Sequence, residues 1–371
     1  MTAVGLAALL LILYTYAGYP VLVAVWARVA PRAGAARDDF EPTVSVCIAI
    51  HDGAEYLPSK LQSLQMLDYP RDKLEILIYS DGSTDATARI ARELSASDPR
   101  VKVLSDGVRR GKPTALNRLY AEATGEVLLM TDVRQQLAPC ALRALLRLLA
   151  DPGVGCVSGS LVLEGNTGPS AYWRYEKFIR ASEARLGSMV GVSGSLYAVR
   201  RADFDELPAD VLLDDMFVPL RIARRHKSVV LSREAEAYDA AQDDDREFSR
   251  KVRTLAGNYQ LVALLPWLLV PGRNPVWFQM FSHKLLRLVC PWALLILFGS
   301  SLVLASASQG SSFGLAFWRM LALGQLLFYA LAALGPRAGR VASLARTFVV
   351  LNAAALVGLW RFARGSQAVT W

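Results

Sequence analysis

The chain has 371 residues, of which 53% are hydrophobic, and its formal net charge is +8. The basic residues form no run with interleaved aromatic residues in the polar part of the chain, which argues against a nucleic-acid partner. Attraction to anionic lipid headgroups and to a diphosphate substrate accounts for the charge instead. The four cysteines lack a Cys-x-x-Cys spacing, which argues against a zinc site or a disulfide framework.

The first predicted element is a membrane helix. Residues 2–26 contain no charge, and about 20 apolar residues in a helix cross a bilayer. A signal peptide is the alternative, but the segment lacks a basic start and its apolar stretch is too long. Arg28, Arg32 and Arg37 follow, and the positive-inside rule then places the next domain in the cytoplasm. We expect an integral protein of a bacterial inner (plasma) membrane, with residues 1–27 as its first anchor.

Residues 38–258 carry the pattern of an α/β domain. Apolar strands at 44–50, 75–79, 101–104 and 127–130 alternate with helices at 56–67, 86–94, 113–123 and 140–149. This alternation predicts a mainly parallel sheet with helices on both faces. The pattern changes after residue 151, where we predict strands at 154–163 and 192–199 and helices at 172–185, 215–225 and 246–265.

The C-terminal region is again apolar. Residues 259–271 predict an amphipathic helix on the cytoplasmic face, within a segment 259–286; the alternative is a last core helix of the preceding domain. In residues 287–371 we predict spans at 288–306 and 317–334. Arg346 interrupts the last stretch and leaves only residues 347–360 uncharged. Three or four spans therefore remain open, and we expect this stretch to lodge at the cytoplasmic face, because a full span would put Arg361 and Arg364 outside.

Carboxylates follow two of the predicted strands. Asp81 ends one apolar run within Ser80-Asp81-Gly82-Ser83-Thr84-Asp85, and Asp132 ends another. Ligands in open α/β sheets lie beyond the carboxyl ends of the strands. Helix capping explains Asp85 but not Asp81. The pair therefore predicts a site for a nucleotide and a divalent cation.

Three further segments offer chemistry. Lys112, beside a helix start, can meet a phosphate or hold a carboxylate, although a solvated basic loop is the alternative. Asp214 and Asp215 begin a helix, where capping explains one and the other can act as a general base. Arg250 and Arg253 share a helix face and suit a diphosphate; a membrane-facing basic helix is the alternative there.

The order of these motifs resembles the inverting glycosyltransferases of family 2, which have a GT-A fold, in the membrane-bound branch with hyaluronan, cellulose and poly-N-acetylglucosamine synthases. The resemblance covers residues 42–258 and the flanking spans. It rests on the motifs Pro42-Thr43-Val44-Ser45-Val46 with His51-Asp52-Gly53, Ser80-Asp81-Gly82-Ser83-Thr84-Asp85, Gly111-Lys112-Pro113-Thr114-Ala115-Leu116-Asn117, Thr131-Asp132-Val133-Arg134, Val192-Ser193-Gly194-Ser195, Leu213-Asp214-Asp215 and Arg250-Lys251-Val252-Arg253-Thr254.

The resemblance implies a nucleotide-sugar donor, expected to be a UDP-sugar, and a lipid-linked or glycan acceptor at the membrane. It implies Asp215 as the catalytic base and Asp132 as the ligand of Mg²⁺ or Mn²⁺. The remaining implied roles are donor binding by Asp81, Ser83, Lys112, Asp132, Arg250 and Arg253, and acceptor binding by Gly194, Ser195 and Asp214.

Two departures from the family pattern refine these expectations. Arg134 stands in place of the second Asp of the metal-binding Asp-x-Asp, so the metal would rest on Asp132 and the diphosphate. The last motif lacks the Gln and Trp that accompany processive polymerisation, and few C-terminal spans are left to line a pore. Addition of one sugar at a time is favoured over a processive polysaccharide synthase. An inactive membrane scaffold is the alternative from another class.

Overall fold

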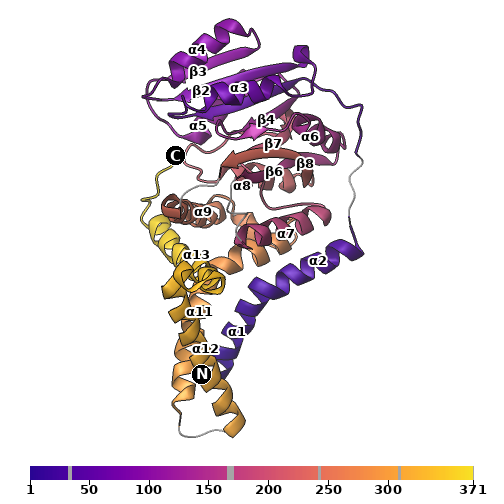
Figure 1. Cartoon of the computed structure of the whole chain (residues 1–371). Helices are drawn as coiled ribbons and strands as arrows, with labels where there is room; N and C mark the ends of the chain where they lie inside the picture. The colour runs from indigo at the N-terminus through magenta and orange to yellow at the C-terminus, as the bar shows by residue number, and fades with distance from the viewer. Residues whose placement is uncertain (32–35, 165–170, 241–243, 308–310, 371) are drawn as a thin grey trace.

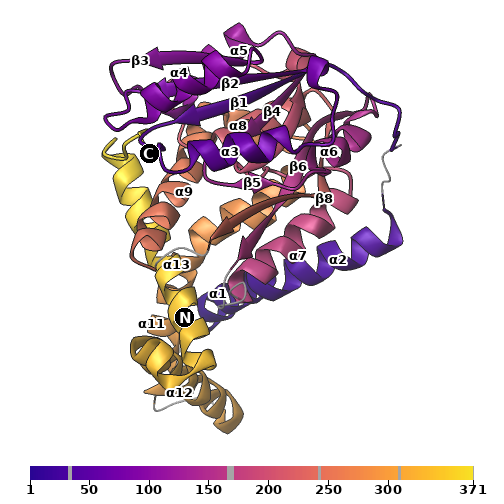
Figure 2. The ribbon, with the colours of Figure 1, turned by 45° about the horizontal axis from the view of Figure 1, so that its top comes forward.

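The computed structural model describes residues 1–31, 36–164, 171–240, 244–307 and 311–370. A sheet domain stands above a narrow stalk of helices, with α7 and α9 between the two (Figure 1). The C-terminus returns to the sheet domain, whereas the N-terminus lies in the stalk (Figures 1 and 2).

One sheet of eight strands organises the upper domain, in the order β3-β2-β1-β4-β7-β6-β8-β5. The strands β1 to β4 run parallel, whereas β7 is antiparallel to both β4 and β6. The mainly parallel, mixed α/β sheet that the sequence predicts is thereby confirmed. The strands are β1 (Val44–Ile50), β2 (Leu74–Asp81), β3 (Val101–Asp106), β4 (Val127–Thr131), β5 (Gln136–Leu137), β6 (Val154–Glu164), β7 (Leu196–Arg200) and β8 (Ser228–Ala240).

Helices cover both faces of the sheet because the central strands bury alternate side chains on opposite sides. In β1, Cys47 and Ala49 join the core beneath α5 and α8, while Val46 and Ile48 join the core beneath α3 and α6. The helices of this domain are α3 (Leu57–Gln65), α4 (Thr87–Ser97), α5 (Lys112–Glu122), α6 (Ala141–Leu149), α7 (Ala171–Arg185), α8 (Asp214–Arg224) and α9 (Asp244–Leu264), with 3₁₀ turns at Arg71–Lys73 and Arg201–Asp203.

The structure departs from the prediction in several elements. β8 was not expected, and a register shift interrupts its pairing with β6, where Leu231 pairs with Ser158 and Glu236 pairs with Ser160. The predicted strand 192–199 begins only at Leu196, since residues before it form a turn. Residues 259–264 are the end of α9 rather than an interfacial helix, and Leu261 is fully buried in the domain core. The alternative of a last core helix describes this segment correctly.

The N-terminal helix does not run straight. α1 (Thr2–Leu13) packs on α11 in the stalk, and a π-helical turn (Tyr14–Gly18) leads into α2 (Tyr19–Val29), which packs on α7. Figure 2 shows α2 lying alongside α7 beneath the sheet domain. The first hydrophobic segment therefore has one half in the stalk and the other against the sheet domain.

The C-terminal region contains α10 (Trp277–Gln279), a π-helical segment (Met280–Leu285), α11 (Leu286–Ala305), α12 (Ser312–Leu334) and α13 (Arg340–Ala363), with 3₁₀ turns at Pro266–Leu269 and Gly335–Ala338. Together with Thr2–Val29, the helical segments Trp277–Ala305, Ser312–Ala338 and Arg340–Ala363 are long and apolar enough to cross a membrane.

The helix α13 leaves the upper end of the stalk and ends beside the sheet domain (Figure 1). It packs closely on α9, where a Cβ atom built on Gly358 would lie only 2.9 Å from the Ala256 nitrogen. The glycine thus permits backbone contact between the two helices. This packing attaches the last apolar segment to the sheet domain as well as to α12.

Candidate active site

Lys112 contacts two aspartates: Asp132, which follows β4, and Asp214, which begins α8. Lys112 is the first residue of α5, and its Nζ lies 2.9 Å from Asp132 Oδ1 and 3.5 Å from Asp214 Oδ2. Burial alone would lower the pKa of Lys112, but Asp132, Asp214 and Asp215 together raise it above the ordinary value. The lysine therefore stays charged and holds three segments of the chain together.

Asp215 lies beside this lysine, in the first turn of α8. A Cβ atom built on Gly194 would lie 3.7 Å from Lys112 Nζ and 3.9 Å from Asp215 Oδ2, which are ordinary van der Waals distances and place Gly194 next to both groups. The turn that carries Gly194 is fixed by the Val192 amide, which donates to the Asp215 carbonyl at 2.8 Å. Gly194 is thus held next to Lys112 and Asp215.

The environment of Asp215 suits a general base. Burial and the nearby Asp214 carboxylate raise its pKa to about 6, while Lys112 and Arg180 oppose the shift. A base is most effective when its pKa is near the working pH. Asp215 also lines a cavity of about 240 Å³ that is bounded by α7, α9 and the π-helical segment before α11. A substrate can therefore reach this carboxylate from the side of the membrane helices.

Asp81 binds the loop before α5 through main-chain hydrogen bonds. Its fully buried carboxylate accepts hydrogen bonds from the Arg110 and Gly111 amides at 2.7 and 2.8 Å. Gly82 allows the loop to approach, since its φ is +60° and a Cβ atom there would lie 2.4 Å from the Arg109 nitrogen. In this structure Asp81 positions the loop that ends at Lys112, and its predicted contact with a nucleoside stays a prediction.

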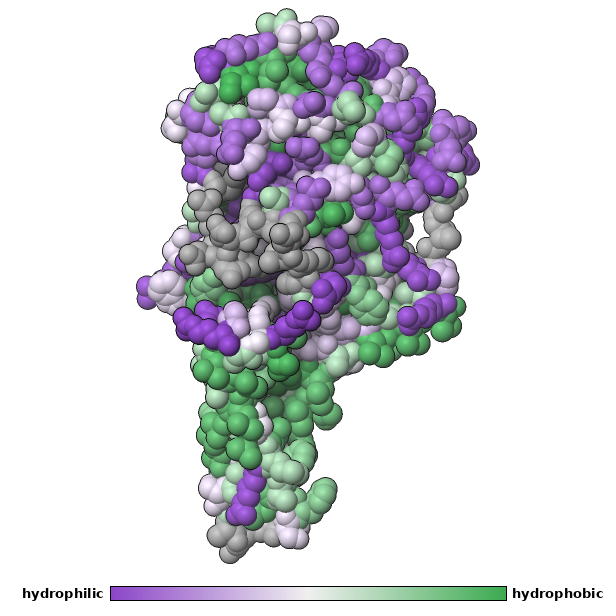
Figure 3. Space-filling model, viewed as in Figure 1, coloured by the Kyte–Doolittle hydropathy of each residue, from purple (hydrophilic) through white to green (hydrophobic). Residues whose placement is uncertain are grey.

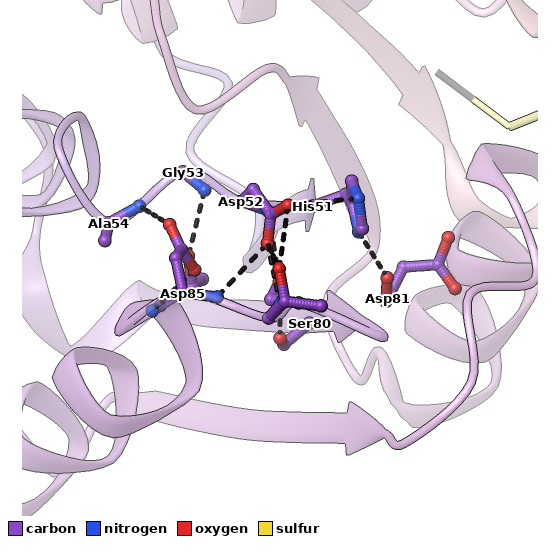
Figure 4. Close-up of polar contacts among 10 residues, drawn as sticks. His51, Asp52, Gly53, Ala54, Ser80, Asp81 and Asp85 are labelled. Atoms are coloured by element: carbon purple, nitrogen blue, oxygen red, sulfur yellow. Dashed lines mark hydrogen bonds and ion pairs between the residues drawn. The ribbon is translucent and has the colours of Figure 1, made fainter.

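A second loop is fastened to the Asp81 turn (Figure 4). The Asp52 carboxylate accepts from the Thr84 amide at 2.7 Å, and the Asp85 carboxylate accepts from the Ala54 amide at 3.0 Å. Asp52 has a φ of 48°, a left-handed conformation that Asp tolerates better than most residues. The His51 ring lies 2.9 Å from the Asp81 carbonyl oxygen. These reciprocal bonds fix the edge of the sheet where β1 and β2 end.

Asp132 offers a partly exposed carboxylate, with 41% of its side chain accessible. Arg134 does not share this site: its guanidinium pairs with the buried Asp239 of β8, which also accepts from Gln135. Among the residues that the structure describes, no three His, Cys, Asp or Glu side chains gather as a metal site. A single carboxylate still fits Mg²⁺ or Mn²⁺ that is held mainly by a diphosphate, as Mg²⁺ commonly is.

The structure thus brings Lys112, Asp132, Gly194, Asp214 and Asp215 together. Other predicted site residues have different surroundings. Ser83 accepts from the Asp52 amide at 3.2 Å, and the Ser195 hydroxyl lies buried, 2.6 Å from the Ser193 hydroxyl, so both stabilise turns. Arg250 is exposed on α9, and Arg253 donates to the main-chain oxygen of Val369.

Arg180 was missed by the sequence analysis. It lies on α7, lines the cavity that holds Asp215, and donates to the Ser158 hydroxyl at 3.4 Å. Burial lowers its pKa, against the attraction of Asp215 and two glutamates. Nothing in the sequence distinguishes Arg180 from the other basic side chains in the predicted helix 172–185. Only the packing of α7 on the sheet shows which of these side chains faces the site.

Three comparisons relate this chain to known proteins. Residues 45–207 match the family described as Glycosyl transferase family 2. Over 137 residues the chain is 28% identical to glycosyltransferase AglE of Haloferax volcanii, covering 37% of this chain and 45% of that protein. Over 192 residues it is 24% identical to beta-monoglucosyldiacylglycerol synthase of Synechocystis sp., covering 49% and 40%. The chain therefore spans less than half the length of these two curated relatives.

A solved structure is similar over almost the whole chain. It is the mannosyltransferase PcManGT from Pyrobaculum calidifontis in complex with GDP-Man and Mn²⁺. The TM-score is 0.77 at 24% sequence identity, with 98% of this chain and 100% of that chain covered. The likeness extends beyond the sheet to the helices at both ends, and it confirms the predicted fold.

Proposed function

Because residues 45–207 match Glycosyl transferase family 2 and the fold is GT-A-like, we propose that the protein transfers a sugar from a nucleotide-sugar donor to a membrane-associated lipid or glycan acceptor. The observation that carries this proposal is the position of Asp215. It lies beside Lys112, which reaches Asp132, and it also lines the cavity that faces the membrane helices. Donor-side and acceptor-side groups thus meet at one carboxylate.

The proposed reaction is a single displacement that inverts the anomeric carbon. Asp215 takes the proton of the acceptor hydroxyl, whose oxygen forms a bond to the anomeric carbon. The bond from that carbon to the diphosphate breaks, and the nucleoside diphosphate leaves with the electron pair. Lys112 holds Asp132 on the donor side and also contacts Asp214. Asp132 would hold Mg²⁺ or Mn²⁺, which as a Lewis acid neutralises charge on the diphosphate.

Two donor bases are to be compared. The family resemblance implies a UDP-sugar, whereas the solved structure of similar fold is a complex with GDP-Man. We expect one sugar per acceptor, because Arg253, in the motif associated with polymerisation, holds the C-terminal tail. Long products would establish the processive alternative. To distinguish these outcomes, membranes that contain the full-length protein are supplied with UDP- or GDP-sugars. The lipid and polymer products are then identified by mass analysis.

The decisive variant is Asp215→Asn, which keeps the shape of the side chain and removes the base. We expect transfer to fall at least a hundredfold, the lower range for general-base contributions, while binding of the nucleotide sugar persists. Asp72→Asn, an equal change at an exposed residue of the turn Arg71–Lys73, is the matched control and keeps full activity. A folded Asp215→Asn protein with wild-type transfer contradicts the mechanism, and absence of nucleotide-sugar binding in the wild type indicates the scaffold alternative.

A further inference from the structure

A second cavity lies outside the cluster around Asp215. It has a volume of about 500 Å³ and is enclosed by α2, α7 and the edge formed by β6 and β8. Its basic lining residues come from three separate elements: Arg28, Arg174, Lys177, Arg180, Arg185 and Arg233. No Asp or Glu lines the cavity among the described residues. Because like charges in a confined space repel, this lining favours an anionic ligand.

Carboxylates outside the lining act on some of these charges: Glu236 attracts Lys177, and Asp215, Glu176 and Glu183 attract Arg180. Among the residues that the structure describes, neither Lys177 nor Arg233 forms an ion pair within 4.0 Å. Lys177 instead lies over the Trp173 ring, with Nζ 5.6 Å from its centroid, and burial lowers the pKa of this lysine. Ser160, Ser182 and Ser193 also line the cavity, and the Ser182 hydroxyl donates to the main-chain oxygen of Phe178. Hydroxyl and cationic donors together are suited to phosphate oxygens.

The location of the cavity indicates an amphiphilic ligand. α2 contributes Ala24, Ala27 and Arg28 to the cavity, while Val21, Val25 and Val29 of the same helix are exposed. Figure 3 shows the hydrophobic surface of the stalk continuing along the underside of the sheet domain, where Figure 1 places α2. The basic cavity therefore borders an apolar surface. Basic residues beside an apolar face are typical of the boundary between lipid headgroups and acyl chains.

We propose that this cavity binds the phosphate-bearing headgroup of a membrane lipid, with the acyl chains lying along α2. Arg180 and Trp173 line both this cavity and the one that contains Asp215. A lipid seated here would place its headgroup next to the acceptor side of the site. That last step rests on the proposed function, whereas the binding of the lipid does not.

Binding can be measured without any donor. We would purify the full-length protein in a neutral detergent and titrate fluorescently acylated phosphatidic acid by anisotropy, with diacylglycerol carrying the same label as the uncharged comparison. Saturable binding is expected only for phosphatidic acid. Equal binding of the two lipids, or binding of inorganic phosphate as tight as that of phosphatidic acid, would overturn the assignment to a lipid headgroup.

The variant Lys177→Gln with Arg233→Gln should weaken phosphatidic acid binding at least tenfold. The matched control, Arg89→Gln with Arg92→Gln, removes two exposed charges of α4 and should change it less than twofold. An equal loss in both variants means that net charge alone attracts the lipid, and this result would contradict the proposed site.

Photo-crosslinking of the wild-type protein with a photoreactive phosphatidic acid gives a second readout. Labelled peptides from α2 or α7 are expected, whereas labels confined to α11 or α12 exclude the cavity. Nucleotide-sugar binding by the same variants separates this result from a failure of the transferase assignment.

Discussion

Arg253 donates a hydrogen bond from Nη2 to the main-chain oxygen of Val369, 3.2 Å away. The same valine reaches the loop before α5, since a Cβ atom built on Gly111 would lie 3.3 Å from Val369 Cγ1. The last residues of the chain therefore contact both α9 and the loop that positions Lys112. This contact places the C-terminus on the side of the catalytic domain.

A tag placed after Trp371 should consequently lie on the same side of the membrane as the sheet domain. The arginine at 346 also disfavours a full fourth span, because a charge at the bilayer centre costs about 2.5–3.5 kcal/mol on insertion scales. We expect a membrane-impermeant reagent to label the tag only after the membrane is opened. A tag in the loop between α11 and α12 is the control and should be labelled in intact cells. Labelling of both tags in intact cells would establish a complete fourth span.

Transfer should depend on pH through Asp215. Burial and Asp214 raise its pKa from 3.8 to about 6, and only the carboxylate can accept the proton of the acceptor. The rate kcat/KM should therefore fall about tenfold per pH unit below pH 6 and be flat just above it. This carboxyl group keeps its proton to higher pH in the folded protein than in the unfolded chain, so its contribution to stability decreases as pH rises from about 4 to 6. A pH profile without an acid limb near 6 contradicts the role of Asp215.

Replacement of Lys112 by Met should destabilise the protein and alter the pH profile together. The change leaves Asp132, Asp214 and Asp215 without their shared cation, and breaking a buried pair costs up to about 3–5 kcal/mol. Because Lys112 lowers the pKa of Asp215, any remaining activity should show its acid limb at higher pH. Lys102→Met removes an exposed lysine paired with Glu75 and serves as the control for thermal unfolding. Equal unfolding temperatures for the two variants would show that the cluster contributes little.

Metal dependence should be strict but the affinity weak. Asp132 is a single carboxylate, and Arg134 is engaged by Asp239 rather than by the donor side. Excess chelator should abolish transfer, and added Mn²⁺ or Mg²⁺ should restore it. Asp132→Ala should abolish transfer at any metal concentration tested, whereas Asp72→Ala, at an exposed residue of the turn Arg71–Lys73, should not. Full activity of the wild type in excess chelator would contradict the proposed role of Asp132.

The parts of the fold that could be predicted are those governed by local pattern. The strands β1, β2 and β4 are apolar runs with carboxylates after them, so both the sheet and the cluster of Asp132 with Lys112 follow from order along the chain. The turn at 192–195 could not be predicted. The β-branched Val192 favours a strand, whereas in the structure its amide donates to the Asp215 carbonyl, a contact between distant segments.

The role of Asp81 shows a second limit of sequence patterns. Its place at the end of β2 predicts a nucleotide contact, whereas its partners in the structure are two main-chain amides, of Arg110 and Gly111. Main-chain donors are present at every residue and leave no trace in a sequence. The same holds for Arg180, whose importance depends on α7 crossing beneath β6. Tertiary placement, rather than residue type, decides which charged side chains reach the site.

A buried cluster beneath the sheet domain affects how the chain is made. Tyr19 of α2 donates to Glu183 of α7 at 2.6 Å, and the ring of His283, before α11, lies 2.7 Å from the same glutamate. Glu183 is fully buried, and an unpaired charge in such a place is costly. During synthesis Glu183 therefore lacks its partner His283 until a hundred further residues have been added to the chain. Docking of the catalytic domain onto its membrane helices is thus a late event in biogenesis, and a ribosome-bound chain that stops before residue 283 should still expose α7 to protease.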